Sequence, residues 1–215
     1  MRGLLVAALA TLLLVAGCGG NGDESSGDNS GSDTCEQVKN PAPREAPVLK
    51  APSGTLDPEK TYELVFDTSC GTFTVTLDQR LAPETTKSLV ALAEEGFYDN
   101  TVFHRIVPGF VIQGGDPTQT GTGGPGYTTT DRPPASAEYT KGVVAMAKAM
   151  DEPPGSAGSQ FFVVTADDAQ LDPDYAIVGE VTDGMDVVER IGVLGDEEQR
   201  PTQPVVIRKV TVQES

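Results

Sequence analysis

The chain has 215 residues, of which 38% are hydrophobic and 22% are charged, and this length and composition suit one globular domain with additional segments. Its 32 acidic and 15 basic residues give a formal net charge of −17, and we exclude nucleic acid as a partner because no basic stripe is present. One histidine is too few for a His-built metal site, and we expect neither a metal nor a cofactor.

The N-terminus predicts export. Arg2 is followed by an apolar run, Leu4–Ala16, which is shorter than the roughly 20 residues that a membrane-spanning helix needs, so we interpret residues 1–17 as a signal peptide. The run ends in Val15-Ala16-Gly17-Cys18, which resembles the bacterial lipobox. Cys18 would then be lipidated and would anchor the mature protein to the extracytoplasmic side of the cell membrane. The alternative is a small-residue cleavage site that happens to end near a cysteine.

Residues 19–34 are all glycine or small polar and acidic residues, so nothing there can be buried and we expect a disordered tether. A proline-rich segment, residues 36–60, follows it. If Cys18 is lipidated, Cys35 and Cys70 remain, and in an oxidising compartment a disulfide between them would pin this segment to the domain. Two unpaired thiols are the alternative, because the sequence does not give the separation of the two Cα atoms.

From Tyr62 onward the pattern consists mainly of short strands. Thr72–Leu77 alternates between polar and apolar residues, which places Phe73, Val75 and Leu77 on one face. The predicted strands are Tyr62–Phe66, Thr72–Leu77, Val102–Val107, Phe110–Gln113, Gly142–Ala147, Gln160–Thr165, Ala176–Val181 and Val205–Val212. This number of strands favours a mainly β fold, a closed eight-stranded antiparallel barrel, since closure removes exposed edges.

Two helices complete the predicted domain, residues 61–215, which follows the lipidated cysteine, tether and proline-rich segment of residues 18–60. Pro83 marks the start of the first helix and Gly96 its stop. Its apolar residues at helical spacing are Leu89, Leu92, Ala93 and Phe97. The second helix fits Met185–Ile191, closed by Gly192.

The stretch Phe103–Asp116, FHRIVPGFVIQGGD, resembles the signature of the cyclophilin-type peptidyl-prolyl isomerases. Further matches follow in the family's order at Gly121–Gly124, Val144–Ala147, Gly158–Phe162, Leu171-Asp172 and Ile177–Gly179. An ordered series over residues 62–213 is much more specific than any single motif. The resemblance implies an eight-stranded barrel capped by two helices, and an enzyme that rotates X–Pro peptide bonds.

The resemblance also implies which residues bind the peptide. Four residues match the apolar pocket that receives the proline ring: Phe110, Val111, Phe162 and Leu171. Gln113 matches the side chain that hydrogen-bonds the substrate backbone, while Ala147 and the backbone of Lys148 match the strand edge along which the peptide lies. Tyr175 replaces a pocket histidine of many members, and it can still wall the pocket and donate a hydrogen bond.

Arg105 is the catalytic residue that the resemblance implies. A permanently charged, planar guanidinium rich in donors can stabilise the amide nitrogen of a twisted X–Pro bond more than that of a planar one. On local sequence alone, Arg105 could equally be a surface salt-bridge residue, and the phenylalanines could be core. His104 matches no chemical role, and alternation along a strand would point it away from Arg105; a structural histidine is therefore favoured over a base.

Other departures from the family concern the groove. The loop Lys148–Gly158 is about three residues longer than usual and could change which flanking residues are preferred. Gln170 replaces a tryptophan of much-studied eukaryotic members, so we expect weak inhibition by cyclosporin. Gly121–Gly126 matches the dinucleotide-binding pattern GxGxxG, but Pro125 interrupts it and residues 127–134 cannot open a helix, so we interpret it as a loop.

We therefore predict a peptidyl-prolyl cis-trans isomerase that acts on proline-containing peptides and unfolded exported proteins. Its domain is expected to be monomeric and tied to the membrane through the lipid anchor. The main alternative is a cyclophilin-fold module that binds such chains without appreciable turnover. A third is a scaffold whose segment 36–60 docks one partner.

Overall fold

The structure is a computed structural model that describes residues 34–215. The expected signal peptide, the expected lipidation site Cys18 and nearly all of the expected tether lie outside the described residues. Within the part of the chain that is described, no helix is both long and apolar enough to cross a bilayer.

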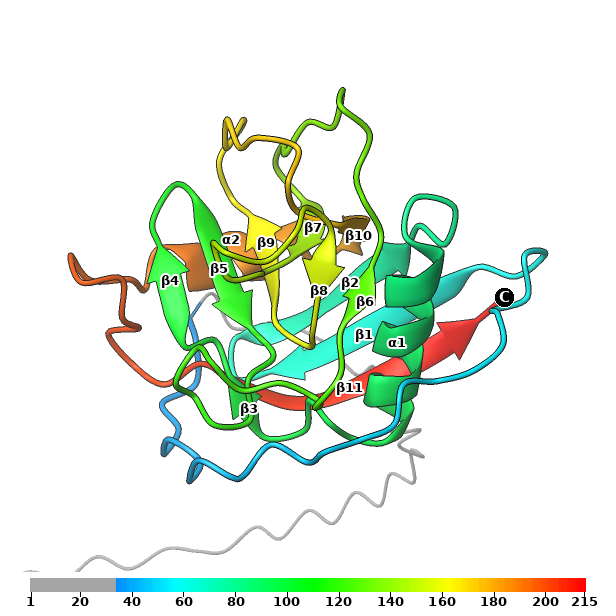
Figure 1. The fold of residues 1–215 in the computed structure, drawn as a ribbon. Coiled ribbons are helices and arrows are strands. Elements are labelled where there is room, and N and C mark those ends of the chain that lie inside the picture. Colours follow the sequence, from blue (N-terminus) through cyan, green and yellow to red (C-terminus); the bar gives the residue numbers. More distant parts are fainter. Residues whose placement is uncertain (1–33) are drawn as a thin grey trace, which may run out of the picture. The chain divides into compact units, whose positions relative to one another are not determined.

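A curled antiparallel sheet forms the body of the domain (Figure 1). Its strands are β1 Tyr62–Thr68, β2 Gly71–Leu77, β3 Thr101–Val102, β4 Arg105–Val107, β5 Val111–Gly114, β7 Val143–Met146, β9 Phe161–Val164, β10 Ile177–Asp183 and β11 Val206–Glu214. Hydrogen bonding joins these nine strands in the order β3-β11-β1-β2-β10-β7-β9-β5-β4. The mainly β fold with two helices is thus confirmed.

One predicted strand, Val102–Val107, is divided in two. Its first part belongs to β3, which pairs with β11, and its second part forms β4, which pairs with β5. The nine strands therefore correspond to the eight predicted ones, and the predicted antiparallel barrel takes the form of a curled nine-stranded half-barrel. Within the described residues no ladder joins β3 to β4; the chain itself connects these two margins through Phe103 and His104.

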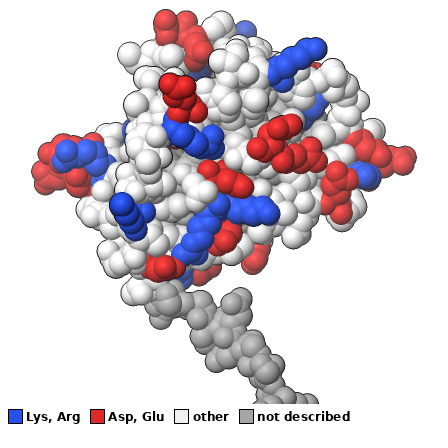
Figure 2. All heavy atoms as spheres, turned by 90° about the horizontal axis from the view of Figure 1, so that it is seen from below, with Lys and Arg blue, Asp and Glu red and all other residues white. Residues whose placement is uncertain are grey.

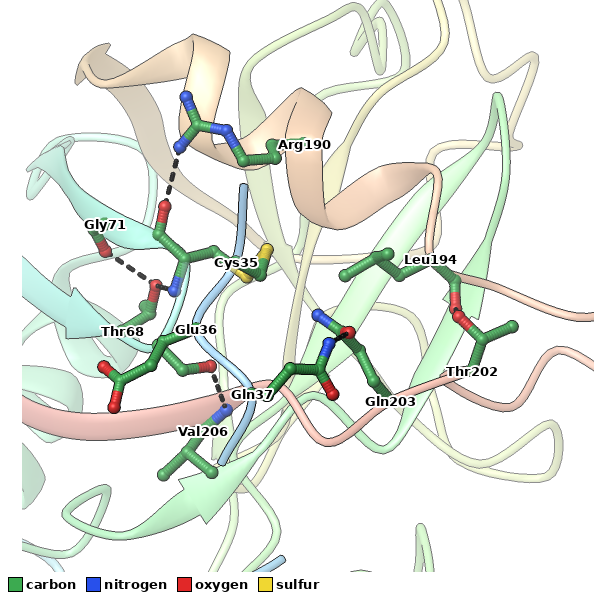
Figure 3. The surroundings of a disulfide bond; sticks show 12 residues. Cys35, Glu36, Gln37, Thr68, Gly71, Arg190, Leu194, Thr202, Gln203 and Val206 are labelled. Carbon is green, nitrogen blue, oxygen red and sulfur yellow. Dashed lines mark hydrogen bonds between the residues drawn. A yellow bond between two sulfur atoms is a disulfide. The ribbon is translucent and has the colours of Figure 1, made fainter. Parts of the chain in front are cut away.

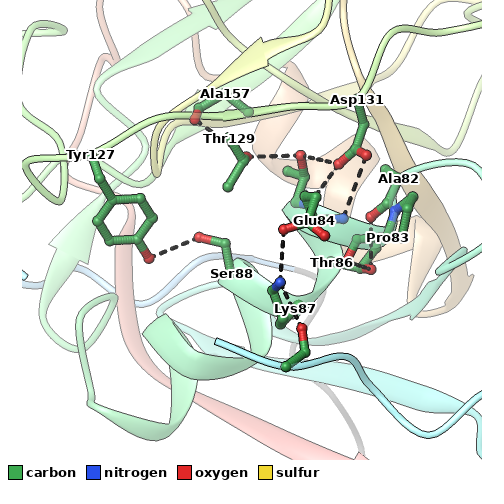
Figure 4. Close-up of polar contacts among 12 residues, drawn as sticks. Ala82, Pro83, Glu84, Thr86, Lys87, Ser88, Tyr127, Thr129, Asp131 and Ala157 are labelled. Carbon is green, nitrogen blue, oxygen red and sulfur yellow. Dashed lines mark hydrogen bonds and ion pairs between the residues drawn. The ribbon is translucent and has the colours of Figure 1, made fainter. Parts of the chain in front are cut away.

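The first helix, α1 Pro83–Glu94, begins with proline, which lacks the N–H that a first turn leaves unpaired. No side chain of its own caps it. Instead Asp131 accepts hydrogen bonds from the N–H of Thr85 (2.7 Å) and from its hydroxyl (2.7 Å) (Figure 4). A carboxylate here satisfies the first-turn donors and complements the helix dipole. Gly96, the predicted stop, follows with φ 66°.

The second helix, α2 Met185–Gly192, includes the glycine that we predicted to close it. A further small sheet was not predicted: β6 Thr129–Thr130 pairs with β8 Ser156–Ala157. Each of these strands has two residues, too few for an alternating pattern to be recognised.

The main hydrophobic core fills the inside of the curled sheet. Phe66 and Phe73 stack with ring centroids 4.7 Å apart, and Phe161 lies 5.2 Å from Phe66. Phe73, Val75 and Leu77 are all buried, as their alternation predicts. On the face shown in Figure 2, acidic and basic side chains are interspersed. Exposed ion pairs of this kind each add little stability.

We call residues 36–60 the lead-in. It contains no helix or strand and runs beneath β3 and β11 toward the C-terminus (Figure 1). At its start the structure joins Cys35 to Cys70 by a disulfide, with Cα atoms 4.0 Å apart (Figure 3). The pairing closes a separation of 35 residues, for which loop entropy gives roughly 3–4 kcal/mol.

Candidate functional site on the outer face of the sheet

Strand register places the expected site residues on the outer face of the sheet. Arg105 on β4 lies opposite Gln113 on β5, and Gln113 lies opposite Phe162 on β9. Residues that face each other across a ladder project from the same side. Their chain neighbours Ile112 and Phe161 project from the other side, into the main core. The period of two thus gives each strand one face for the core and one for the site.

A second hydrophobic cluster, distinct from the main core, covers this outer face. It contains all of the apolar residues that the resemblance implied for the peptide site: Phe110, Val111, Ala147, Phe162, Leu171 and Tyr175. Val111 and Phe162 are buried, whereas the other four are partly exposed. We call this set the outer cluster. Because its floor is closed and its rim is open, it offers an apolar surface that a small ring can cover.

Aromatic contacts hold the rim of the outer cluster. The ring of Tyr175 meets Phe162 edge to face at 5.4 Å and Tyr139 at 6.1 Å. The buried Tyr139 hydroxyl donates to the carbonyl of Tyr175 (2.7 Å) and accepts from its N–H (3.1 Å). Burial is the main cause that raises the pKa of Tyr139, so it remains a neutral donor. The backbone at Tyr175 is therefore fixed.

Arg105 stands beside the outer cluster with its charge uncompensated. Its Nε donates to Oε1 of Gln199 (2.8 Å) and its Nη1 to Oε1 of Gln113 (3.2 Å). Both acceptors are neutral amides, and no carboxylate among residues 34–215 forms an ion pair with this guanidinium. The surface salt-bridge interpretation of Arg105 is therefore wrong.

A chain of amide side chains leads away from Arg105. Gln113 donates to Gln160 (3.1 Å), and Gln160 donates to the carbonyl of Gly123 (3.0 Å). Gln160 and Gln199 were not among the expected site residues. Gln160 lies within the family match GSQFF, so the sequence could have indicated it as a site residue. Gln199 lies in the loop between α2 and β11, where no sequence motif indicates a site residue.

A cavity of about 680 Å³ adjoins the outer cluster, and we call it the side cavity. Gln113, Ala147 and Lys148, all expected site residues, line it together with Gln160. The rest of its wall is the segment Gly121–Thr128, parts of the loop after Lys148, and Gly158-Ser159. The aromatic residues of the outer cluster do not line it. The groove thus has two parts, an apolar surface and a more polar cavity, which share Ala147.

Asp116 organises the wall of the side cavity. Its buried carboxylate accepts hydrogen bonds from Thr118 N–H (2.7 Å), Thr118 hydroxyl (2.7 Å), Gly121 N–H (2.7 Å) and Gly123 N–H (3.1 Å). Burial disfavours the charged form, but these hydrogen bonds prevail and lower the pKa of Asp116 below its ordinary value. A Cβ on Gly123 would lie 2.0 Å from Oδ1 of Asp116, so this glycine is required by close approach. We call residues 116–128 the cavity loop.

Lys148 differs from the expectation that only its backbone matters. Its side chain is 5% exposed. The ammonium donates to the carbonyls of Ala149 (3.3 Å) and Glu152 (3.0 Å) and lies 5.7 Å from the centroid of Tyr175. Glu152 in turn accepts from the N–H of Ala149 (2.6 Å). The lysine therefore ties the extended loop after β7 to the rim of the outer cluster.

His104 precedes β4 and lies near the cavity loop. Within residues 34–215 neither of its ring nitrogens has a hydrogen-bond partner. Burial is the main cause that lowers the pKa of His104, Arg105 adds to it and Asp116 opposes it. The ring is thus a neutral, half-buried neighbour of the site without the partner that a general base requires.

The fold and this face together define a class: mainly β proteins with a curled antiparallel sheet, two helices and a second apolar cluster on the outer face of the sheet. Comparison with known proteins identifies the family. The cyclophilin type peptidyl-prolyl cis-trans isomerase/CLD family matches residues 63–212. The chain belongs to this family of enzymes.

Individual proteins similar to this chain carry the name of the same enzyme class. Peptidyl-prolyl cis-trans isomerase-like 1 from Aspergillus oryzae is 41% identical over 157 residues, covering 71% of this chain and 96% of that protein. The protein of the same name from Neurospora crassa is 43% identical over 155 residues, covering 70% and 93%. A crystal structure of a cyclophilin type peptidyl-prolyl cis-trans isomerase from Cryptosporidium parvum, in the presence of the dipeptide Ala-Pro, has a TM-score of 0.65. It is 31% identical and covers 70% of this chain and 98% of that one.

Proposed function

We propose that this protein accelerates rotation about X–Pro bonds in exported proteins, with Arg105 as the catalytic residue. The observation that carries the proposal is an uncompensated guanidinium beside a half-open apolar surface. Rotation faces a barrier of about 18–20 kcal/mol because the amide C–N bond is partly double. Proton abstraction from carbon and covalent intermediates are not needed, so binding and electrostatics suffice.

In this proposal the outer cluster holds the proline ring while the acyl side of the bond turns. As the amide twists, its nitrogen regains a lone pair, and a donor of Arg105 stabilises that lone pair more than the planar amide. Gln113 holds the guanidinium through Nη1, and its amide would hydrogen-bond the substrate backbone. Ala147 and Lys148 border the path along which the peptide extends.

Arg105→Ala tests this mechanism. We expect kcat/KM for rotation in a short X–Pro peptide, measured by exchange NMR, to fall about 10²- to 10³-fold, as for loss of one preorganised donor. Peptide affinity should change little, since the outer cluster remains. Arg105→Lys is the matched control: it keeps the charge but loses the planar fork, and should recover part of the rate.

Equal kcat/KM values for wild type and Arg105→Ala would refute the proposed role of Arg105. If the wild-type protein binds the peptide but leaves its rotation rate unchanged, the protein is a binding module rather than an isomerase.

We also propose that the protein acts outside the cytoplasmic membrane, anchored through a lipid on Cys18. The support is the pattern of residues 1–18: a basic start, a short apolar run and a lipobox-like end. Cys18→Ser should release the protein from the membrane fraction into the soluble fraction. Continued sedimentation of this variant with membranes would refute lipidation.

A further inference from the structure

We propose that the lead-in is a positioning element of the peptide groove: it supports the cavity loop from outside and thereby sets which residues flanking proline are accepted. This inference rests on the proposed function. The lead-in precedes the family match at residues 63–212, so the support comes from a part of the chain outside that match.

The lead-in contacts the cavity loop near both ends and in the middle. Near one end Arg44 N–H donates to the carbonyl of Pro117 (3.1 Å), and near the other Leu49 N–H donates to that of Pro125 (2.8 Å). Between them, Nε2 of Gln119 donates to the carbonyl of Pro41 (2.9 Å). The Oε1 of Gln119 also accepts from Nδ2 of Asn40 (3.0 Å). Four hydrogen bonds over nine positions of the loop, Pro117 to Pro125, thus fix it to the lead-in.

Packing reaches the wall of the side cavity itself. Gly126 and Pro125 line that cavity. A Cβ on Gly126 would lie 2.9 Å from Cγ1 and 3.2 Å from Cα of Val48, so the lead-in lies directly behind the wall. Moving the lead-in away would leave the wall unsupported on that side.

The lead-in is itself held firmly enough to act as a support. At its start the disulfide and a hydrogen bond from Glu36 N–H to Ser69 (2.7 Å) attach it to the turn between β1 and β2 (Figure 3). Midway, the Arg44 guanidinium bonds the carbonyl of Phe97 and lies 5.9 Å from its ring centroid. Further on, Lys87 of α1 donates to the carbonyl of Gly54 (2.8 Å).

The remaining supports of the cavity loop lie elsewhere. Asp116 holds its inner side. At its far end Tyr127 bonds the hydroxyl of Ser88 on α1 (2.9 Å), while Thr129, just beyond the loop, bonds Thr85 (2.9 Å) (Figure 4). The outer contacts described above are made by the lead-in. The width of the side cavity between the cavity loop and Lys148 therefore depends on where the lead-in lies.

The test compares Leu49→Pro, which removes the N–H that bonds Pro125, with Leu49→Ala, which keeps that N–H and shortens the side chain. Both are assayed as the full domain with its disulfide formed. The probes are X–Pro peptides in which one flanking residue at a time is changed from glycine to leucine. We expect the leucine-to-glycine ratio of kcat/KM at one flanking position to change about three- to tenfold in Leu49→Pro, the size of one lost hydrogen bond. Leu49→Ala should stay within about twofold of wild type.

Gln119→Ala provides a second test, because it removes both middle hydrogen bonds without altering the lead-in. It should change the same ratio in the same direction, and the amide NMR signals of Gly121 and Gly123 should shift in both Leu49→Pro and Gln119→Ala.

Unchanged ratios in both variants would overturn the inference. So would an equal loss of rate for every peptide with a lower Tm, since that outcome indicates a purely structural role. If the wild-type protein accelerates no peptide, the proposed function fails instead; the same ratios are then taken from peptide dissociation constants, and they decide the inference independently.

Discussion

The two faces of β5 and β9 are built from the same short stretches of chain, but one packs into the main core and the other carries the outer cluster. Inward, Ile112 and Phe161 are almost fully buried within the main core. Outward, Gln113 and Phe162 belong to a surface that stays partly open and lies beside Arg105, which has no ion pair within residues 34–215. The inner face is stabilised by burying its apolar area, whereas the outer face keeps part of its apolar area in water, as the proposed peptide site requires.

This contrast is sharpest at two adjacent phenylalanines. Phe161 contacts the rings of Phe66 (5.2 Å), Tyr98 (6.0 Å) and Phe103 (6.1 Å). Phe161→Ala should lower the free energy of unfolding by about 3–5 kcal/mol, because an enclosed core cavity results. Phe162→Ala should cost less stability, since the partly exposed Tyr175 packed on Phe162 can move into the space, but should raise KM. Denaturant unfolding measures the change in stability, and peptide kinetics measure the change in KM. Equal losses of stability in the two variants with unchanged KM would show that the two faces do not differ in this way.

A smaller effect is expected at the edge of the outer face. Gln199→Ala removes the acceptor of Arg105 Nε and should lower kcat about three- to tenfold with little change in KM, because the guanidinium is then less well positioned. The Arg105 Nε–H signal in NMR should shift. Glu198→Ala is the control: its carboxylate pairs with Arg200 (2.9 Å) in the same loop. A matching loss of kcat in Glu198→Ala would assign the effect to the loop as a whole.

The smallest effect concerns His104, at the boundary between the two faces. Burial lowers its pKa in the folded protein, whereas in the unfolded chain it has the ordinary value of about 6.5. Stability from this group is therefore present above that value and is lost as pH falls through it toward the folded pKa. We expect Tm to fall less between pH 7 and 5 in His104→Phe than in wild type. Identical profiles of Tm against pH in wild type and His104→Phe would contradict a lowered pKa of His104 in the folded protein.

Much of the fold follows from local patterns. The alternation in Thr72–Leu77 and the Pro83 start of α1 depend on neighbours in the chain, and the structure agrees with both. The outer cluster was implied by the ordered family motifs rather than by spacing. Locally, Phe161 and Phe162 look alike, and strand pairing decides which one faces inward.

What could not be predicted depends on contacts between distant residues. Gln199 reaches Arg105 across 94 positions of sequence. The cavity loop owes its shape to one carboxylate, Asp116, and to the lead-in, neither of which leaves a periodic signal. The lead-in reads as a polar, proline-rich segment, and its course over the barrel is set by the Cys35–Cys70 pairing that the sequence left open.

The interruption between β3 and β4 has a consequence for assembly. One continuous stretch supplies both margins of the sheet: Thr101 and Val102 pair with β11, and Arg105–Val107 pair with β5. The N–H groups of Phe103 and Ile106 bond the segment that leads into β11, at Val205 (3.0 Å) and Gln199 (2.9 Å). Arg105 lies within this seam. Arg105 meets Gln113 within the local β4–β5 pairing, whereas its hydrogen bond to Gln199 forms only when the segment before β11 lies against this seam. We therefore expect a partly folded sheet, with the seam still open, to lack the second acceptor that positions the proposed catalytic guanidinium.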